Sequence, residues 1–159
     1  MAKSLATKHD AGLAAEIISR FGAKPEMLLQ VLHAFMERYG FIAEEAIRQI
    51  ASELNLSRAE VHGVVSFYHD FRTEPPGRHV VKICQAEACQ AMGSRALTAH
   101  AEQKLGAALG TTAENGHASF EPVYCLGLCA SAPAMLIDGK LHSRVDTETF
   151  DTIVDGLGD

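Results

Sequence analysis

Apolar residues recur at helical spacing along the first 73 positions of the chain. The longest stripe consists of Met27, Leu28, Val31, Leu32, Phe35, Met36 and Tyr39. Shorter stripes of the same period lie over residues 13–21, 46–54 and 61–68. Spacings of three and four place the apolar side chains of each stripe on one helix face. We therefore predict four helices that pack as a small antiparallel bundle, because each must cover its apolar face with another.

Residues at the expected helix ends agree with this prediction. Pro25 suits a first helical position, since its φ is fixed and it lacks an N–H group. Gly40 can end the longest helix in a left-handed conformation. Ser57, followed three residues later by Glu60, has the pattern of a capping box, in which each side chain accepts the other residue's backbone N–H. The fourth helix is therefore expected to open at Ser57.

The hydrophobic pattern changes after the segment Thr73-Glu74-Pro75-Pro76-Gly77, which is rich in residues that break helices and strands. We place a domain boundary here, with a helical bundle over residues 1–73 and a second domain over residues 74–159. The elements expected in the second domain are a strand at 79–83, a helix at 91–109, strands at 119–124, 134–137 and 140–144, and a last amphipathic helix that carries Phe150, Ile153, Val154 and Leu157.

The second domain is thus predicted to have the order β-α-β-β-β-α, a mixed α/β layer. Its last two strands flank Asp138-Gly139, a strong signal for a two-residue hairpin turn. The fold class expected for the whole chain is α+β, a helical bundle followed by an α/β domain.

Composition and charge exclude several classes of function. The chain has 14 basic and 20 acidic side chains and a net charge of -6, which argues against binding nucleic acid, since that needs a basic face. No run of about 18 apolar residues is present, so no membrane span is expected. The first residues do not have the pattern of a secretory signal. We expect a cytoplasmic protein, in which cysteines remain reduced.

All four cysteines of the chain form one pattern. Cys84 and Cys89 are a C-x4-C pair, and Cys125 and Cys129 are a C-x3-C pair that follows after 35 intervening residues. Each pair begins where a predicted strand ends. Because strand ends at one edge of a sheet lie close together, the two pairs are expected to converge.

Several kinds of site could use four converging cysteines. A [2Fe–2S] cluster takes four thiolates, two on each iron. Zinc also takes four, although structural zinc sites favour tighter C-x2-C knuckles. Disulfides are disfavoured by the expected compartment, and a redox-active C-x-x-C is absent. Eight histidines are present, but none lies between the two cysteines of a pair. Spacing alone favours iron–sulfur and leaves zinc open.

Three stretches carry a resemblance to a known family. They are GVVSFYHDFRTEPPGRHVVKIC, CQAMG and YCLGLCASAPAM, between Gly63 and Met135. Together with LNLSRAEVHGVVSFY they resemble the small thioredoxin-like [2Fe–2S] subunit of NADH dehydrogenases, the 24-kDa or E subunit. The same module occurs in NAD-linked hydrogenases and in molybdenum- or tungsten-containing NAD-dependent formate dehydrogenases. The form CQAEACQAMG is most like the gamma subunit of the formate dehydrogenases.

This resemblance implies a thioredoxin-like second domain and a [2Fe–2S] cofactor held by Cys84, Cys89, Cys125 and Cys129. It implies one-electron transfer, as a non-catalytic subunit, beside a flavoprotein subunit that binds FMN and NAD. A larger molybdenum- or tungsten-containing catalytic subunit is a further expected partner, with formate as the expected substrate of the complex. The chain itself has no G-x-G-x-x-G after a strand, so NAD is not expected on it.

Two alternatives accompany this expectation. One is the equivalent subunit of an NADH:quinone oxidoreductase or an NAD-linked hydrogenase. The other, of a different class, is a zinc-stabilised binding module without redox activity.

Overall fold

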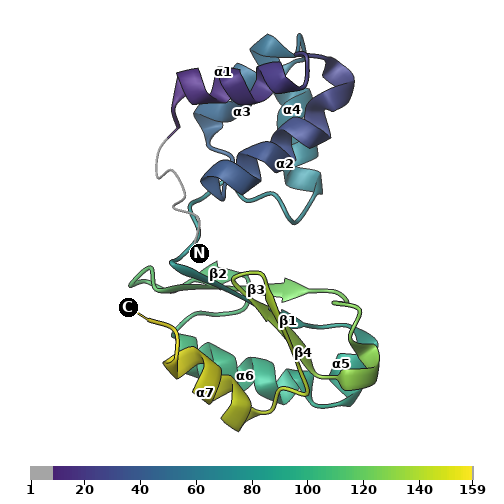
Figure 1. Ribbon diagram of the computed structural model, residues 1–159, viewed down its shortest axis with the longest axis vertical. Helices are drawn as coiled ribbons and strands as arrows, with labels where there is room; N and C mark the ends of the chain where they lie inside the picture. Colours follow the sequence, from purple (N-terminus) through teal and green to yellow (C-terminus); the bar gives the residue numbers. More distant parts are fainter. Residues whose placement is uncertain (1–8, 159) are drawn as a thin grey trace. The chain divides into compact units, whose positions relative to one another are not determined.

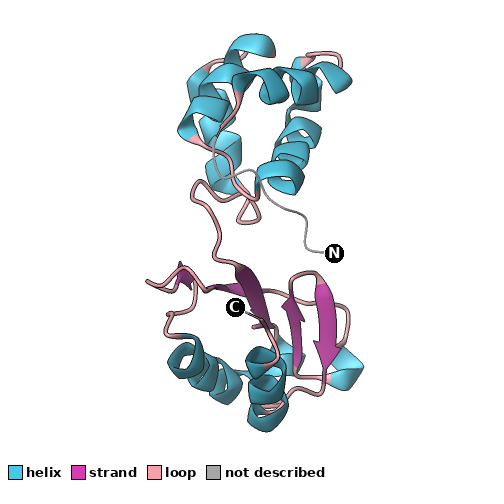
Figure 2. Ribbon diagram, turned by 60° about the vertical axis from the view of Figure 1, so that its left-hand side comes forward, coloured by secondary structure: helices cyan, strands magenta, loops and turns pink. Residues whose placement is uncertain are grey.

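A computed structural model describes residues 9–158 of the chain. The chain divides into two compact units, and the division falls between Pro75 and Pro76. The sequence placed it two residues earlier, within the same breaker segment. Over residues 9–75 the regular structure is helical, whereas the second unit combines helices with a sheet (Figures 1 and 2).

The N-terminal unit is the predicted four-helix structure. Its elements are α1 (Ala11–Arg20), the 3-10 turn η1 (Pro25–Met27), α2 (Leu28–Tyr39), α3 (Glu44–Glu53) and α4 (Arg58–Phe67). The expected apolar stripes supply most of its core, to which Ile42 adds from the loop before α3. The largest fully buried side chains are Phe35, Ile18, Leu32, Ile42, Ile47, Ile50, Leu54 and Val31. Burying each such side chain contributes about 1.5–3 kcal/mol.

The predicted helix ends are present. Gly40 has a φ of 79° and ends α2 in the left-handed conformation. The side chain of Ser57 accepts the N–H of Glu60, whose carboxylate accepts the N–H of Ser57 at 2.8 Å, so the capping box is complete. Pro25 begins the 3-10 turn that precedes α2 rather than the α-helix itself. The helix therefore lies where it was predicted, but its first turn is a 3-10 turn and the α-helix begins only at Leu28.

The C-terminal unit is built on a five-stranded sheet. Its strands are β1 (His79–Cys84), β2 (Thr111–Thr112), β3 (Ala118–Val123), β4 (Ala134–Ile137) and β5 (Lys140–Ser143), in the order β2-β3-β1-β4-β5. Its helices are α5 (Glu87–Ala91), α6 (Ser94–Leu105) and α7 (Thr147–Asp155), with a 3-10 turn η2 (Cys129–Ser131). β1 pairs in parallel with β3, and the other pairings are antiparallel.

One strand and one α-helix of this unit were missed by the sequence prediction, as was the 3-10 turn η2. β2 has only two residues, too few to show an alternating pattern. α5 has five residues, and its apolar side chains are mostly alanine. The predicted helix at 91–109 is shorter, because Gly93 and Gly106 both adopt left-handed conformations and bound α6.

The Asp138-Gly139 turn joins β4 and β5 as predicted. Asp138 and Gly139 have φ values of 48° and 83°, and positive φ at both central residues is the pattern of a type I′ turn. A different glycine, Gly77, allows the chain to approach β3 closely, since a Cβ there would lie 2.7 Å from the carbonyl carbon of Ala118. The N–H of Gly77 donates to the buried Ser119 hydroxyl at 2.8 Å.

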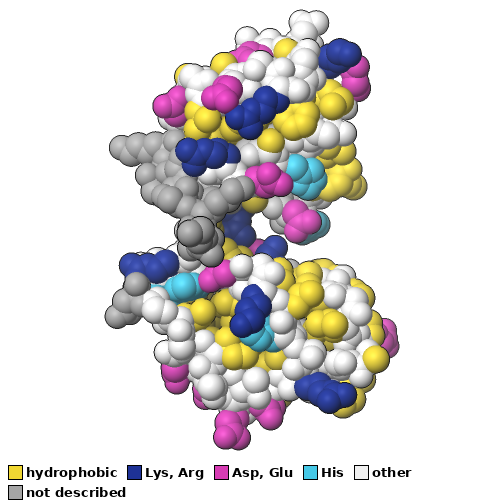
Figure 3. Space-filling view, viewed as in Figure 1, with side chains coloured by type: hydrophobic (Ala, Val, Ile, Leu, Met, Phe, Trp, Pro, Cys, Tyr) yellow, Lys and Arg dark blue, Asp and Glu magenta, His cyan; other side chains and the backbone are white. Residues whose placement is uncertain are grey.

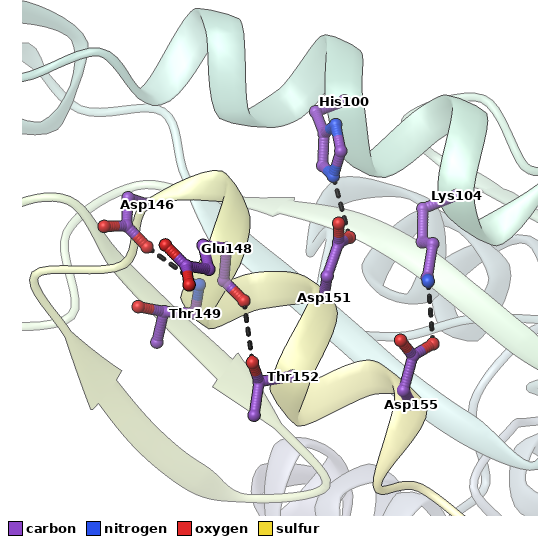
Figure 4. A network of polar contacts seen from close by, with 8 residues as sticks. All are labelled: His100, Lys104, Asp146, Glu148, Thr149, Asp151, Thr152 and Asp155. Carbon is purple, nitrogen blue, oxygen red and sulfur yellow. Dashed lines mark hydrogen bonds and ion pairs between the residues drawn. The ribbon is translucent and has the colours of Figure 1, made fainter.

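Helices α6 and α7 lie on the same side of the sheet (Figure 1). Val81, Ile83, Phe120 and Met135 belong to the buried core of this unit, together with Phe150 of α7. Figure 4 shows two ion pairs that join the helices: His100 with Asp151 and Lys104 with Asp155, each at 2.7 Å. Both pairs are partly exposed, so apolar burial contributes most to the packing.

No helix among residues 9–158 is long and apolar enough to cross a membrane.

A histidine joins three parts of the C-terminal unit. Nδ1 of His79, at the start of β1, lies 2.6 Å from a carboxylate oxygen of Asp138 in the hairpin turn. Nε2 lies 3.1 Å from the carbonyl oxygen of Gly158. Both neighbours are acceptors, so only the doubly protonated imidazolium can donate to both. The hydrogen bond with Asp138 raises the pKa of His79, although partial burial opposes this.

A raised pKa means that the folded chain holds the His79 proton more tightly than the unfolded chain. The resulting stabilisation should be complete below the ordinary histidine value of about 6.5. It should be lost as the pH rises through the raised pKa. Asp138→Asn removes the charge but keeps a residue suited to the turn. We expect it to lower the thermal midpoint of the unit near pH 6 much more than near pH 9, as measured by circular dichroism.

Asp155→Asn is the matched control, since its partner Lys104 does not titrate in this interval. Its effect should be the same at both pH values. An effect of Asp138→Asn that does not vary with pH would contradict an ionised His79 that bridges these segments.

Candidate metal centre

The four cysteines lie where β1 and β3 end. Cys84 is the last residue of β1, and Cys125 is the second residue after β3. Cys84 pairs with Val123 in the parallel register of the two strands. Cys89 lies on α5 and Cys129 begins η2. The strands run in the same direction, so their following segments meet at one edge of the sheet (Figure 1).

The contacts between the cysteines bring both pairs together. The N–H of Cys125 donates to Sγ of Cys84 at 3.4 Å, which joins the two loops directly. Sγ of Cys125 and Sγ of Cys129 are 3.7 Å apart, and Cys84 and Cys89 lie together in one buried cluster. The predicted convergence of Cys84, Cys89, Cys125 and Cys129 is therefore present in the structure.

The arrangement is one of two adjacent pairs. Among residues 9–158, no group of three or more His, Cys, Asp or Glu side chains is already arranged around one point as the ligands of a metal ion. In the second loop the sulfur atoms of Cys125 and Cys129 are 3.7 Å apart, and the N–H of Cys125 lies 3.4 Å from Sγ of Cys84 in the first loop. Two plus two thiolates is the donor set that a [2Fe–2S] cluster takes.

The two pairs differ in their exposure. Cys84 and Cys89 are 1% and 2% exposed, whereas Cys125 and Cys129 are open to solvent. Burial raises the pKa of the Cys89 thiol. Burial has the same effect on Cys84, but the N–H groups of Ala86 and Cys125 donate to its sulfur, and its pKa is lowered on balance. These N–H groups stabilise a thiolate at Cys84, which is the form that binds metal.

In the second cysteine loop, which runs from Cys125 to Cys129, a left-handed backbone directs an N–H group at a cysteine sulfur. Cys125 and Gly127 both have a φ of 77°. This conformation lets the N–H of Gly127 donate to Sγ of Cys125 at 3.4 Å. Sγ of Cys129 hydrogen-bonds with Cys125, and this raises the pKa of Cys129.

Polar side chains hold the backbone of the first cysteine loop, which runs from Cys84 to Cys89, through hydrogen bonds. The fully buried hydroxyl of Ser94 donates to the carbonyl oxygen of Cys84. Gln90 donates to the carbonyl oxygen of Gln85 at 2.6 Å, and Arg95 donates to the side-chain oxygen of Gln90 at 2.7 Å. Sequence reasoning missed these supporting residues. The only signal was the helix that was expected to follow Cys89, and no spacing marks which of its polar residues turn inward.

A family model described as the thioredoxin-like [2Fe-2S] ferredoxin matches residues 14–158. The chain belongs to this family. Its fold is thioredoxin-like and its cofactor is a [2Fe–2S] cluster, as the resemblance implied. The family match covers the helical unit as well as the unit that carries the cysteines.

Several relatives are components of one kind of complex. The chain is 32% identical over 117 residues to the E subunit of the NADH-quinone oxidoreductase of Pseudomonas aeruginosa, covering 74% of this chain and 70% of the relative. It is 32% identical over 133 residues to the corresponding E subunit of Aquifex aeolicus, covering 82% and 83%. These alignments span most of both proteins.

A solved structure has a similar fold within a longer chain. An NAD+-reducing [NiFe]-hydrogenase matches 81% of this chain with a TM-score of 0.71 and 26% identity. The matched part is 22% of the hydrogenase chain. The two chains therefore share a module that forms about a fifth of the hydrogenase chain.

The Ser94 hydroxyl gives a test of how the first loop is held. Ser94→Ala leaves the buried carbonyl oxygen of Cys84 without this donor, which should lower the free energy of unfolding by about 1–3 kcal/mol. Amide hydrogen exchange in β1 and at the start of α6 should accelerate accordingly. Ser143→Ala, at an exposed position of β5, is the control and should leave these amides unchanged. Equal protection in both variants would contradict the supporting role of Ser94.

Proposed function

We propose that this chain is an electron-transfer subunit whose cluster is held by Cys84, Cys89, Cys125 and Cys129. The observation that carries the proposal is the meeting of the two cysteine pairs at one sheet edge, with the N–H of Cys125 donating to Sγ of Cys84. Four sulfur donors suit the [2Fe–2S] cofactor of the family. A bound [2Fe–2S] cluster supplies a centre that accepts and releases one electron at a time.

The role of the protein is to hold and orient this centre. The buried pair, Cys84 and Cys89, excludes water on one side, and the exposed pair, Cys125 and Cys129, opens the site toward a partner. Backbone N–H groups that donate to cysteine sulfur stabilise negative charge there, which is one of the ways in which a protein adjusts reduction potential. Tyr124, next to Cys125, is 73% exposed and is suited to contact a partner.

The partner is proposed to be a flavoprotein subunit that binds FMN and NAD. The relatives belong to NADH-quinone oxidoreductases, and the similar structure is an NAD+-reducing hydrogenase. These similarities favour a subunit of an NADH:quinone oxidoreductase or an NAD-linked hydrogenase over the formate dehydrogenase that the CQAEACQAMG segment suggested. A formate dehydrogenase with a molybdenum- or tungsten-containing subunit therefore stays a prediction, as does a cytoplasmic location. The family match favours iron–sulfur over the zinc-stabilised module.

Cys125→Ser tests the cysteines as ligands. Replacing one thiolate should sharply lower the iron and acid-labile sulfide content, because a cluster needs all four donors. The purified native protein should contain equal amounts of iron and sulfide, and its visible absorption should bleach with dithionite. Circular dichroism should show that the N-terminal helices of the variant remain folded.

All four cysteines belong to the site, so the control is Ser131→Ala in the same loop, which should keep full iron content. A Cys125→Ser protein with an unaltered cluster spectrum would remove Cys125 from the ligand set. Copurification of the native chain with a flavoprotein tests the proposed partner, and a native complex that lacks flavin would contradict it.

A further inference from the structure

A groove of about 510 Å³ opens in the C-terminal unit next to both cysteine loops. Three segments form its walls: the junction of α5 and α6, the loop after Cys129, and the segment between β5 and α7. The residues that matter here are Met92, Ala96, Ala130, Pro133, Arg144 and Asp146. Small and apolar side chains provide most of this surface.

Two residues of the groove wall, Met92 and Ala130, lie close in the chain to a cysteine. Met92 is three residues after Cys89, and its N–H donates to the carbonyl oxygen of Cys89 at 3.2 Å. Ala130 directly follows Cys129 in η2. A segment bound in the groove would therefore lie beside both loops that carry the sulfur atoms. Figure 3 shows apolar side chains gathered at the end of the C-terminal unit where β1 and β3 finish.

Met92 and Arg144 are presented to the solvent at this groove. Met92 is 63% exposed, so its apolar side chain is accessible to a bound segment. The guanidinium of Arg144 has no hydrogen bond or ion pair with any residue that the structure describes. Asp146, the nearby acid, has its carboxylate engaged with the N–H of Thr149 at 2.8 Å. The groove thus combines an apolar wall with an arginine that is not paired with Asp146, although both charges line it.

The backbone of Arg144 supports a functional role for this charge. Arg144 has a φ of 52°, a left-handed conformation that costs free energy for a residue other than glycine. Two hydrogen bonds hold it there: its N–H donates to the carbonyl oxygen of Ser131 at 2.8 Å, and the N–H of Val145 donates to that of Pro133 at 3.1 Å. Glycine would meet the same geometry without strain. Strained residues that persist tend to mark functional positions.

We propose that this groove binds a segment of the flavoprotein subunit that carries a carboxylate next to an apolar side chain. The carboxylate pairs with Arg144, and the apolar side chain packs against Met92. Charge complementarity selects this occupant, since Arg144 in the groove wall offers a guanidinium that forms no ion pair with a described acid. The inference rests on the proposed function, because it assigns the docking surface of the same partner.

Titration of the flavoprotein subunit, purified from the native complex, against the cluster-loaded chain tests the proposal. Arg144→Glu should weaken binding at least about tenfold, because it places like charges together. Arg144→Lys should keep most of the affinity. The charge-matched control is Lys140→Glu, at an exposed position of β5 outside the groove, which should change the affinity less than about twofold. Higher salt should reduce the difference between the native chain and Arg144→Glu.

Arg144→Gly separates recognition from folding. It removes the strain, so the thermal midpoint should stay the same or rise while binding weakens. Native binding by Arg144→Glu would overturn the docking surface and leave the proposed function standing. A cluster-loaded native chain that does not bind the flavoprotein at all would overturn both the partner and the groove.

Discussion

The parallel pairing of β1 with β3 is the constraint on which the rest of the site depends. The pairing sets Cys84 opposite Val123, so the chain leaves both strands at the same edge of the sheet and at the same level. The N–H of Cys125 can then reach Sγ of Cys84. A shift of the register by one residue would turn the side chains of one strand to the opposite face of the sheet. The cysteines would then no longer meet.

Several interactions hold this register. The core side chains of β1 and β3, Val81, Ile83 and Phe120, are all buried, and a slip would expose them to solvent. Lys82 and Glu121 pair across the strands at 3.2 Å, and the Ser94 hydroxyl binds the carbonyl group at the end of β1. Near the start of the strands, Gly77 brings the backbone close to Ala118. The strands are thus fixed at both ends, and the two loops extend from a rigid edge.

The same edge gives the site two unlike sides. One cysteine pair is enclosed by the protein and the other faces outward, next to the exposed Tyr124. An electron carrier needs both properties, since enclosure protects the cofactor and exposure lets a partner approach. The family match extends over the helical unit as well, so the bundle is part of the family's architecture rather than an addition to this chain.

The sequence by itself determined the elements that depend on local pattern. Helical periodicity identified the four-helix bundle, the capping box at Ser57 and Glu60 marked the start of α4, and Asp138-Gly139 fixed the turn of the last hairpin. The four cysteines and their spacing pointed to a metal centre. Each of these signals acts between residues that are neighbours in the chain, and for that reason it can be read without the fold.

The tertiary structure decided what depends on distant residues. β2 gains its hydrogen bonds only by lying next to β3, and α5 is too short to form without the packing around it. The burial of Cys84 and Cys89 and the exposure of Cys125 and Cys129 follow from how the loops lie on the sheet, which their similar sequences do not show. The inward direction of Ser94 and the strained Arg144 beside the groove likewise arise from contacts between segments far apart in the chain, and no spacing rule encodes them.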